Sequence, residues 1–160
     1  MADVVAAEIV KVQRQVTYAG AKAALEAALA KAEELGVNAG VVVTDSRGDI
    51  VAAGKTEGAG ARAWRGGHLK ATTAAGLGRS TEEFLEKRLK QDEVLWRAMS
   101  ANPETFIVPG GIPLLYAGKP VGGIGVSGGH YADDAKVAQA GADRFAELAA
   151  EAETAAAADG

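Results

Sequence analysis

Two histidines are the side chains of this sequence best suited to chemistry near neutral pH. His68 and His130 are its only histidines, and each directly follows a pair of glycines. A neutral imidazole transfers protons or ligates iron near pH 7. Because two distant segments share this arrangement, we predict that both histidines line one pocket as catalytic groups, with Glu57 as a further acid or base. The alternative is that both imidazoles are structural or surface groups, and that Glu57 is a solvated turn carboxylate.

Further polar groups stand close to these histidines in the sequence. Arg65 and Lys70 flank His68, and Tyr131 follows His130 directly. A guanidinium or an ammonium group could hold a carboxylate of a ligand. We therefore expect Arg65, Lys70 and Tyr131 to bind the substrate, although both cations could instead be ordinary solvated groups. The aspartates at 133 and 134 could tune His130, or could cap the helix that follows, which is the better interpretation for Asp134.

Glycine-rich backbone precedes the second histidine. The stretch GGIGVSGG covers residues 122–129, and PGG covers residues 109–111. Glycine allows a ligand or another backbone to approach closely, and free amides in such turns bind anions. We expect this backbone to contact an anionic ligand. The positions concerned are Pro109, Gly110, Gly111, Ser127, Gly128 and Gly129.

Other glycine motifs fit this block poorly. Its spacing does not match G-x-G-x-x-G within a βαβ unit, and GxxxxGK[ST] is absent, so these motifs do not indicate nucleotide binding. Residues 125–129 match the G-x-S-x-G nucleophile elbow literally. That elbow belongs to a parallel sheet, however, and needs a positioned histidine and acid. Ser127 is therefore better interpreted as a hydrogen-bonding turn residue.

The elements that must position these groups follow a simple order. Helical patterns alternate with two pairs of short β-rich segments, and each pair is joined too tightly for a crossover helix. The sequence therefore predicts an α/β domain with a mainly antiparallel sheet and helices on its faces. The expected helices cover residues 17–35, 62–77, 81–99 and about 131–153, and the expected hairpins cover residues 39–55 and 114–126.

Composition limits the classes of function. The 160 residues predict a single domain over 1–160, with residues 1–12 and 154–160 expected to fray. The net charge of −4 and the lack of a basic cluster with aromatics argue against nucleic acid as a partner. No run of 18 apolar residues or secretory signal is present, so we expect a cytoplasmic protein without a membrane partner. Without cysteine, thiolate chemistry is excluded; we expect a small-molecule ligand and no metal site.

One block of this sequence resembles a known family. PGGIPLLYAGKPVGGIGVSGG, at residues 109–129, is similar to the hallmark of the GlcG/HbpS-like family, many of whose members are described as heme-binding. VVVTDSRGDIVAAGKTEGAG and KATTAAGLGRST, further upstream, agree with it. The resemblance implies a profilin-like fold with a central antiparallel sheet of about five strands, flanked by helices on both faces, and assembly into a homo-oligomer.

The resemblance leaves three functions open. The first, which we expect, is a cofactor-independent acid–base enzyme, such as a lyase, isomerase or hydrolase, acting on a small organic acid or aromatic metabolite. The second is a heme-binding, heme-sensing or heme-degrading protein, and the third is a noncatalytic oligomeric accessory protein. The family's heme ligand is not fixed on one motif position, so no residue is assigned to the iron. No cofactor is therefore required, while heme is a possible one.

Overall fold

A four-stranded antiparallel sheet lies at the centre of the protein. A computed structural model describes residues 9–159. The strands form two hairpins, and their order across the sheet is β2-β1-β4-β3, so that the first strand of one hairpin pairs with the second strand of the other. The strands are β1 (Gly40–Asp45), β2 (Ile50–Lys55), β3 (Gly111–Tyr116) and β4 (Lys119–Ser127).

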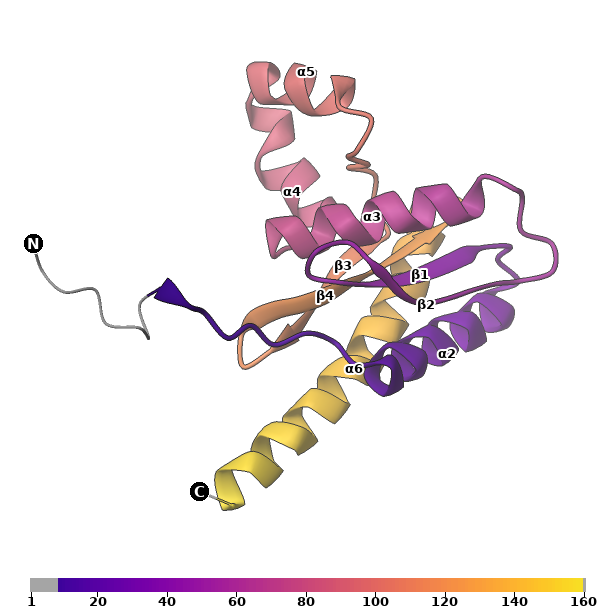
Figure 1. Cartoon of the computed structure of the whole chain (residues 1–160). Helices are drawn as coiled ribbons and strands as arrows, with labels where there is room; N and C mark the ends of the chain where they lie inside the picture. The colour runs from indigo at the N-terminus through magenta and orange to yellow at the C-terminus, as the bar shows by residue number, and fades with distance from the viewer. Residues whose placement is uncertain (1–8, 160) are drawn as a thin grey trace, which may run out of the picture.

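Helices cover both faces of this sheet (Figure 1). Helices α2 (Tyr18–Leu35) and α6 (Tyr131–Ala158) pack on one face, and α3 (Ala63–Leu77) packs on the other. The structure therefore confirms the predicted antiparallel sheet with helices on both of its faces. No helix within residues 9–159 is long and apolar enough to cross a membrane.

The resemblance implied about five strands, and the described residues form four. The segment before α2 comes nearest to being a fifth strand. Its backbone bond to the sheet joins the Val16 amide to the Val121 carbonyl at 2.9 Å, and one bond does not make a ladder. The finer assignment to a profilin-like fold remains a prediction.

Short-range signals set the ends of several elements. The Thr17 side chain accepts a hydrogen bond from the Gly20 amide at 3.2 Å and caps α2, and Gly36 ends that helix with φ 65°. In the β3–β4 hairpin, Ala117 and Gly118 have φ of 48° and 73°. Positive φ at both central residues is typical of the tight type I′ turn.

The helix predicted over residues 81–99 is wrong in its continuity. Arg88 has φ −124° and ψ −59°, which interrupts the helix, and the Asp92 side chain then accepts from the Leu95 amide at 2.9 Å to start another. None of the second helix is buried, and its Val94 is 80% exposed. The three pieces are α4 (Thr81–Lys87), the 3₁₀ helix η1 (Leu89–Gln91) and α5 (Glu93–Ala101).

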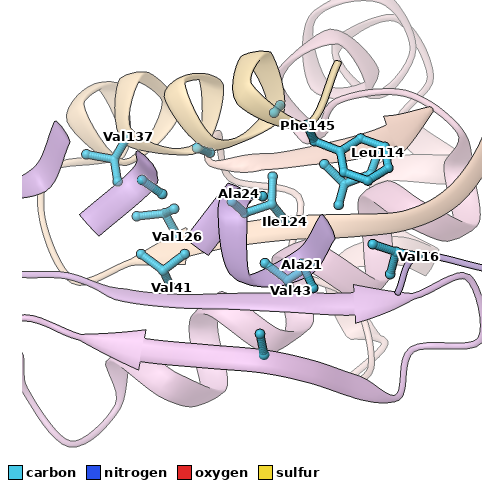
Figure 2. Packing of buried hydrophobic residues seen from close by; sticks show 14 of the residues in the cluster. Val16, Ala21, Ala24, Val41, Val43, Leu114, Ile124, Val126, Val137 and Phe145 are labelled. Carbon is cyan, nitrogen blue, oxygen red and sulfur yellow. The ribbon is translucent and has the colours of Figure 1, made fainter. Parts of the chain in front are cut away.

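The main core lies between the sheet and the α2–α6 pair (Figure 2). Small side chains let the two helices approach closely, since a Cβ at Gly141 would lie 2.7 Å from the Ala24 carbonyl oxygen. The end of α6 was expected to fray from residue 154, and the structure keeps it helical to Ala158. Residues 1–12 were also expected to fray, and residues 1–8 of this range lie outside the described residues.

Candidate functional site

A cavity of about 340 Å³ opens beside the N-terminal end of α3. Its walls come from this helix, from the segment that leads into β3 and from the end of β4. Its volume falls in the range of about 300–1,000 Å³ found for small-molecule sites. We call it the arginine cavity, and its lining residues are Arg62, Arg65, Gly66, Leu69, Thr105, Phe106 and Ser127.

Two cations and an aromatic ring give this cavity its chemistry. Arg62 and Arg65 are exposed, and neither has a carboxylate within 4.0 Å anywhere in residues 9–159. A guanidinium group binds a carboxylate through two parallel hydrogen bonds. Phe106 adds a half-buried apolar surface to the same cavity. The arrangement suits a ligand that has both a flat apolar part and carboxylates.

The glycine pair before His68 serves packing. A Cβ at Gly66 would overlap the Ser127 side chain, and a Cβ at Gly67 would lie 3.1 Å from the Gly125 carbonyl oxygen. Bare backbone at these positions therefore lets α3 lie directly on β1 and β4. Their cost to helix propensity, about 1 kcal/mol each, is offset by this close contact.

A buried ion pair lies behind the arginine cavity. The Lys70 ammonium is 2.9 Å from Oδ2 of Asp134 and donates to the Val126 carbonyl oxygen at 2.8 Å, and both side chains are at most 3% exposed. The same ammonium lies 5.2 Å from the ring centroid of Phe106. The pair thus joins α3, the end of β4 and α6 around one side of the cavity. Lys70 was predicted to bind the substrate, but its charge is already paired inside the protein.

Burial lowers the pKa of Lys70 from its usual 10.5, because desolvation disfavours the ammonium more than the attraction of Asp134 favours it. Between the lowered folded-state pKa and 10.5, the unfolded chain binds more protons than the folded chain. The contribution of Lys70 to stability therefore rises with pH in this window. Below the folded-state pKa, its full desolvation penalty is present.

We expect urea unfolding to report this titration. From pH 8 to pH 10.5, the free energy of unfolding of the natural protein should rise relative to that of a Lys70→Met/Asp134→Leu variant, which lacks both groups. A relative fall over the same interval would mean that the attraction of Asp134 outweighs desolvation.

The two histidines are held by separate local hydrogen bonds. Nε2 of His68 lies 2.7 Å from the Gly48 carbonyl oxygen in the β1–β2 turn; since a carbonyl only accepts, Nε2 carries the proton. His130 is exposed and caps α6, with Nδ1 accepting from the Ala132 amide at 3.2 Å. Neither imidazole lines the arginine cavity. A pocket shared by both histidines remains a prediction that this geometry does not favour.

The other predicted side chains lie apart from the cavity lining. Glu57 is exposed in the loop after β2. Tyr131 is 52% exposed, and its ring centroid lies 4.1 Å from that of His130. Of the predicted set, the arginine cavity brings together Arg65 and Ser127.

The backbone predicted to bind an anion is largely engaged within the protein. The Gly111 amide donates to Oγ1 of Thr81 at 3.1 Å, and the Gly129 amide donates to Oδ1 of Asp134 at 3.0 Å. The predicted capping role of Asp134 is wrong, because His130 is the N-cap of α6; Asp134 instead binds the amide just before the cap and holds Lys70. Pro109 and Gly110 are buried in the segment that leads into β3. Gly128 has a positive φ of 137°, a backbone conformation that favours glycine.

The glycines of β4 face protein rather than an open cavity. A Cβ at Gly123 would overlap the Ala71 carbonyl oxygen, and a Cβ at Gly125 would overlap the Gly67 carbonyl oxygen. At Gly128, directly after β4, a Cβ would lie 2.6 Å from the Asn38 carbonyl oxygen. The block was expected to bring a ligand close to the backbone, but at these three positions it brings α3 and the loop before β1 close.

Sequence reasoning missed several residues of the arginine cavity, chief among them Arg62 and Phe106. Residues three apart on a helix are neighbours, so the helix expected over residues 62–77 was enough to pair Arg62 with Arg65. Phe106 lies in an irregular segment far from α3 in the sequence, and no local pattern joins it to that helix. The other missed residues are Gly66, Leu69 and Thr105.

Comparison with known proteins shows similarity over most of the chain. Residues 16–143 match the family described as "Haem degrading protein HbpS-like". The chain is 30% identical over 134 residues to an uncharacterized 15.0 kDa protein from the dhaT-dhaS intergenic region of Citrobacter freundii, covering 83% of this chain and 94% of that protein.

Solved structures are similar as well. A double mutant of HbpS from Streptomyces reticuli has 34% identity and a TM-score of 0.75, covering 89% of this chain and 97% of that one. The fold is also that of PduOC, solved as a heme complex, with 22% identity and a TM-score of 0.73, over 81% of this chain and 94% of that one.

Proposed function

Since the chain belongs to the HbpS-like family, we propose that it binds heme and that the arginine cavity is the heme site. A structural relative in complex with heme supports the ligand class. The choice of site rests on the two arginines beside the Phe106 ring, Arg62 and Arg65. Neither has a carboxylate partner among residues 9–159. The acid–base enzyme expected from the sequence has less support, because its two histidines serve separate structural hydrogen bonds.

The residues present fit the chemistry of heme. Heme carries two propionates, which Arg62 and Arg65 would hold, and an apolar macrocycle, which Phe106 and Leu69 would contact. When bound, the iron supplies redox and ligand-binding chemistry, which the family description "Haem degrading" makes relevant to this protein. The protein's own part is to hold the anionic edge and to shield one face of the ring from water.

His130 lies three residues after Ser127, a residue of the cavity lining. Its Nδ1 lone pair is used by the Ala132 amide, so a neutral ring carries its proton on Nε2. That nitrogen cannot ligate iron until the cap opens, which costs about 1 kcal/mol. We therefore assign heme affinity to the arginines rather than to His130.

A hemin titration followed at the Soret band tests the site. The natural protein should saturate near one heme per chain, and Arg62→Met/Arg65→Met should weaken binding at least about 10-fold, because each lost charge-assisted hydrogen bond is worth about 1.5–3 kcal/mol when desolvated. Arg79→Met removes an exposed arginine outside the cavity and should leave the affinity unchanged. Equal affinities for all three proteins would contradict the proposed site.

A second variant separates the role of the histidine. His130→Asn keeps a good capping side chain and removes the imidazole, so heme affinity and the Soret position should not change. A shifted Soret band would instead make His130 an iron ligand.

The homo-oligomer implied by the resemblance also remains a proposal. Exposed apolar side chains on α5, Val94 at 80% and Trp96 at 45%, support it, because association would remove them from water. Light scattering should give a mass that is a multiple of 16.2 kDa, whereas a monomer at micromolar concentration would contradict it.

A further inference from the structure

A second and larger cavity, of about 470 Å³, lies on the opposite side of the sheet from α3. It is enclosed by the segment before α2, the first turn of α2, the second half of α6 and the β3–β4 hairpin, and it shares no residue with the arginine cavity. We call it the apolar cavity. Its lining residues are Arg14, Gln15, Val16, Thr17, Ala19, Gly20, Tyr116, Val121, Phe145, Leu148, Ala149 and Ala152.

Hydrogen bonds hold the walls of this cavity in place. Two of them join Gln15 to Ser46. Nε2 of Gln15 donates to the Ser46 hydroxyl at 2.6 Å, and Oε1 of Gln15 accepts from the Ser46 backbone amide at 2.9 Å. On the far side, the Ala117 amide donates to Oε1 of Glu153 at 2.8 Å and ties the hairpin to α6. The cavity is therefore preformed, which lowers the ordering cost of binding a ligand.

Small residues at the start of α2 leave the space open. A Cβ at Gly20 would lie 3.1 Å from the Phe145 ring, so a larger residue there would fill the space beside that ring. Ala19 and Ala149 line the same cavity with single methyl groups. The result is a hydrocarbon-lined hollow bounded by Phe145 and Leu148.

One charged side chain borders this hydrocarbon surface. Arg14 is the single ionisable group with a full charge at neutral pH among the lining residues, and its guanidinium lies 5.0 Å from the ring centroid of Tyr116. It has no carboxylate within 4.0 Å among residues 9–159. Stacking on Tyr116 orients the guanidinium while leaving its N–H groups to bind an anion.

We propose that the apolar cavity binds an amphiphilic carboxylate, such as a free medium-chain fatty acid. The hydrocarbon chain lies against Phe145, Leu148 and Ala149, and the carboxylate binds Arg14. This ligand class follows from the combination of an apolar lining with one unpaired cation at its edge, which neither a sugar nor a nucleotide would match. The site is separate from the proposed heme site and does not depend on it.

Calorimetric titration with decanoate tests the proposal on the full chain. We expect saturable binding near one decanoate per chain. Arg14→Met should weaken decanoate binding about 10-fold and leave binding of the neutral analogue 1-decanol within about twofold, since the methionine keeps the apolar stem. Absence of saturable binding, or equal decanoate affinity in the variant, would overturn the proposal.

A second pair of variants checks the location. Ala152→Trp places a ring in the cavity from an exposed position of α6 and should abolish binding of both compounds, while Ala150→Trp, exposed on the same helix outside the lining, should not. Melting temperatures establish that both variants fold. Unchanged decanoate binding in folded Ala152→Trp would contradict the site. If the natural protein bound no decanoate and Ala152→Trp changed the assembly mass, the cavity would instead be assigned to a second copy of the chain.

Heme serves as the cross-check between the two sites. Hemin affinity should be unaffected by Ala152→Trp, and decanoate affinity should be unaffected by the Arg62→Met/Arg65→Met pair. If Ala152→Trp lost hemin binding while Arg62→Met/Arg65→Met kept it, heme would lie in the apolar cavity and both assignments would be overturned.

Discussion

Removing one member of the Lys70–Asp134 pair is expected to destabilise the protein by roughly 3–5 kcal/mol. Both side chains are almost fully buried, so either one left alone is a charge without its counter-ion in a region of low polarity. In Lys70→Met, Asp134 retains the Gly129 amide but loses its cation. In Asp134→Leu, Lys70 retains the Val126 carbonyl oxygen but loses its anion.

The double variant is the informative one. Lys70→Met/Asp134→Leu leaves no unpaired charge, and replacing a buried pair by apolar groups of similar size is often neutral or stabilising. We therefore expect it to be more stable than either single variant, by at least about 2 kcal/mol. Urea unfolding of the four proteins at pH 7 measures the coupling. Additive losses in the double variant would show that the two side chains contribute independently.

The second large effect is expected at the glycines of β4. Gly125→Ala should destabilise the protein by about 3 kcal/mol, the upper end for an overpacked interior. The new methyl group would overlap the Gly67 carbonyl oxygen and the Ala71 amide nitrogen. These are backbone atoms of α3, so no side-chain rotation can relieve the overlap, and the helix must move away from the sheet.

Gly76→Ala is the matched control, because it makes the same change within α3. Beyond its chain neighbours and the adjacent backbone of its own helix, a Cβ at Gly76 would have no heavy atom within 4 Å, and alanine favours a helix over glycine by about 1 kcal/mol. We expect this variant to be as stable as the natural protein or more so in the same unfolding experiment. A comparable loss at both positions would mean that the close packing of α3 on β4 is not what Gly125 provides.

The fold was predictable where local chemistry decides it. Thr17 and Gly36 mark the ends of α2, and the short links within residues 39–55 and 114–126 allow only hairpins. The break between α4 and α5 was harder to see, since Leu89 continues the apolar pattern across it. Asp92 was the available signal, because aspartate often begins a helix.

The site was predictable only in part, because its residues meet through tertiary contacts. Lys70 lies one helical turn after Gly66 and one before Ala74, in a row of small residues. A lysine in such a row belongs to the buried face of a helix, a signal that the sequence reasoning did not use. Its partner 64 residues later could not be identified from local pattern. For the same reason, glycines that suggested a ligand loop turned out to accommodate a helix.

The most direct test of the central proposal is to locate bound heme on the protein. Ferric heme is paramagnetic, so NMR spectra recorded with one equivalent of hemin should lose the amide signals nearest to the iron. The proposed site requires the strongest broadening at Gly66, Leu69, Phe106 and Ser127, with the amides of Ala19 and Leu148 in the apolar cavity retained. Broadening centred on Ala19 and Leu148, with Phe106 and Ser127 unaffected, would contradict the arginine cavity as the heme site.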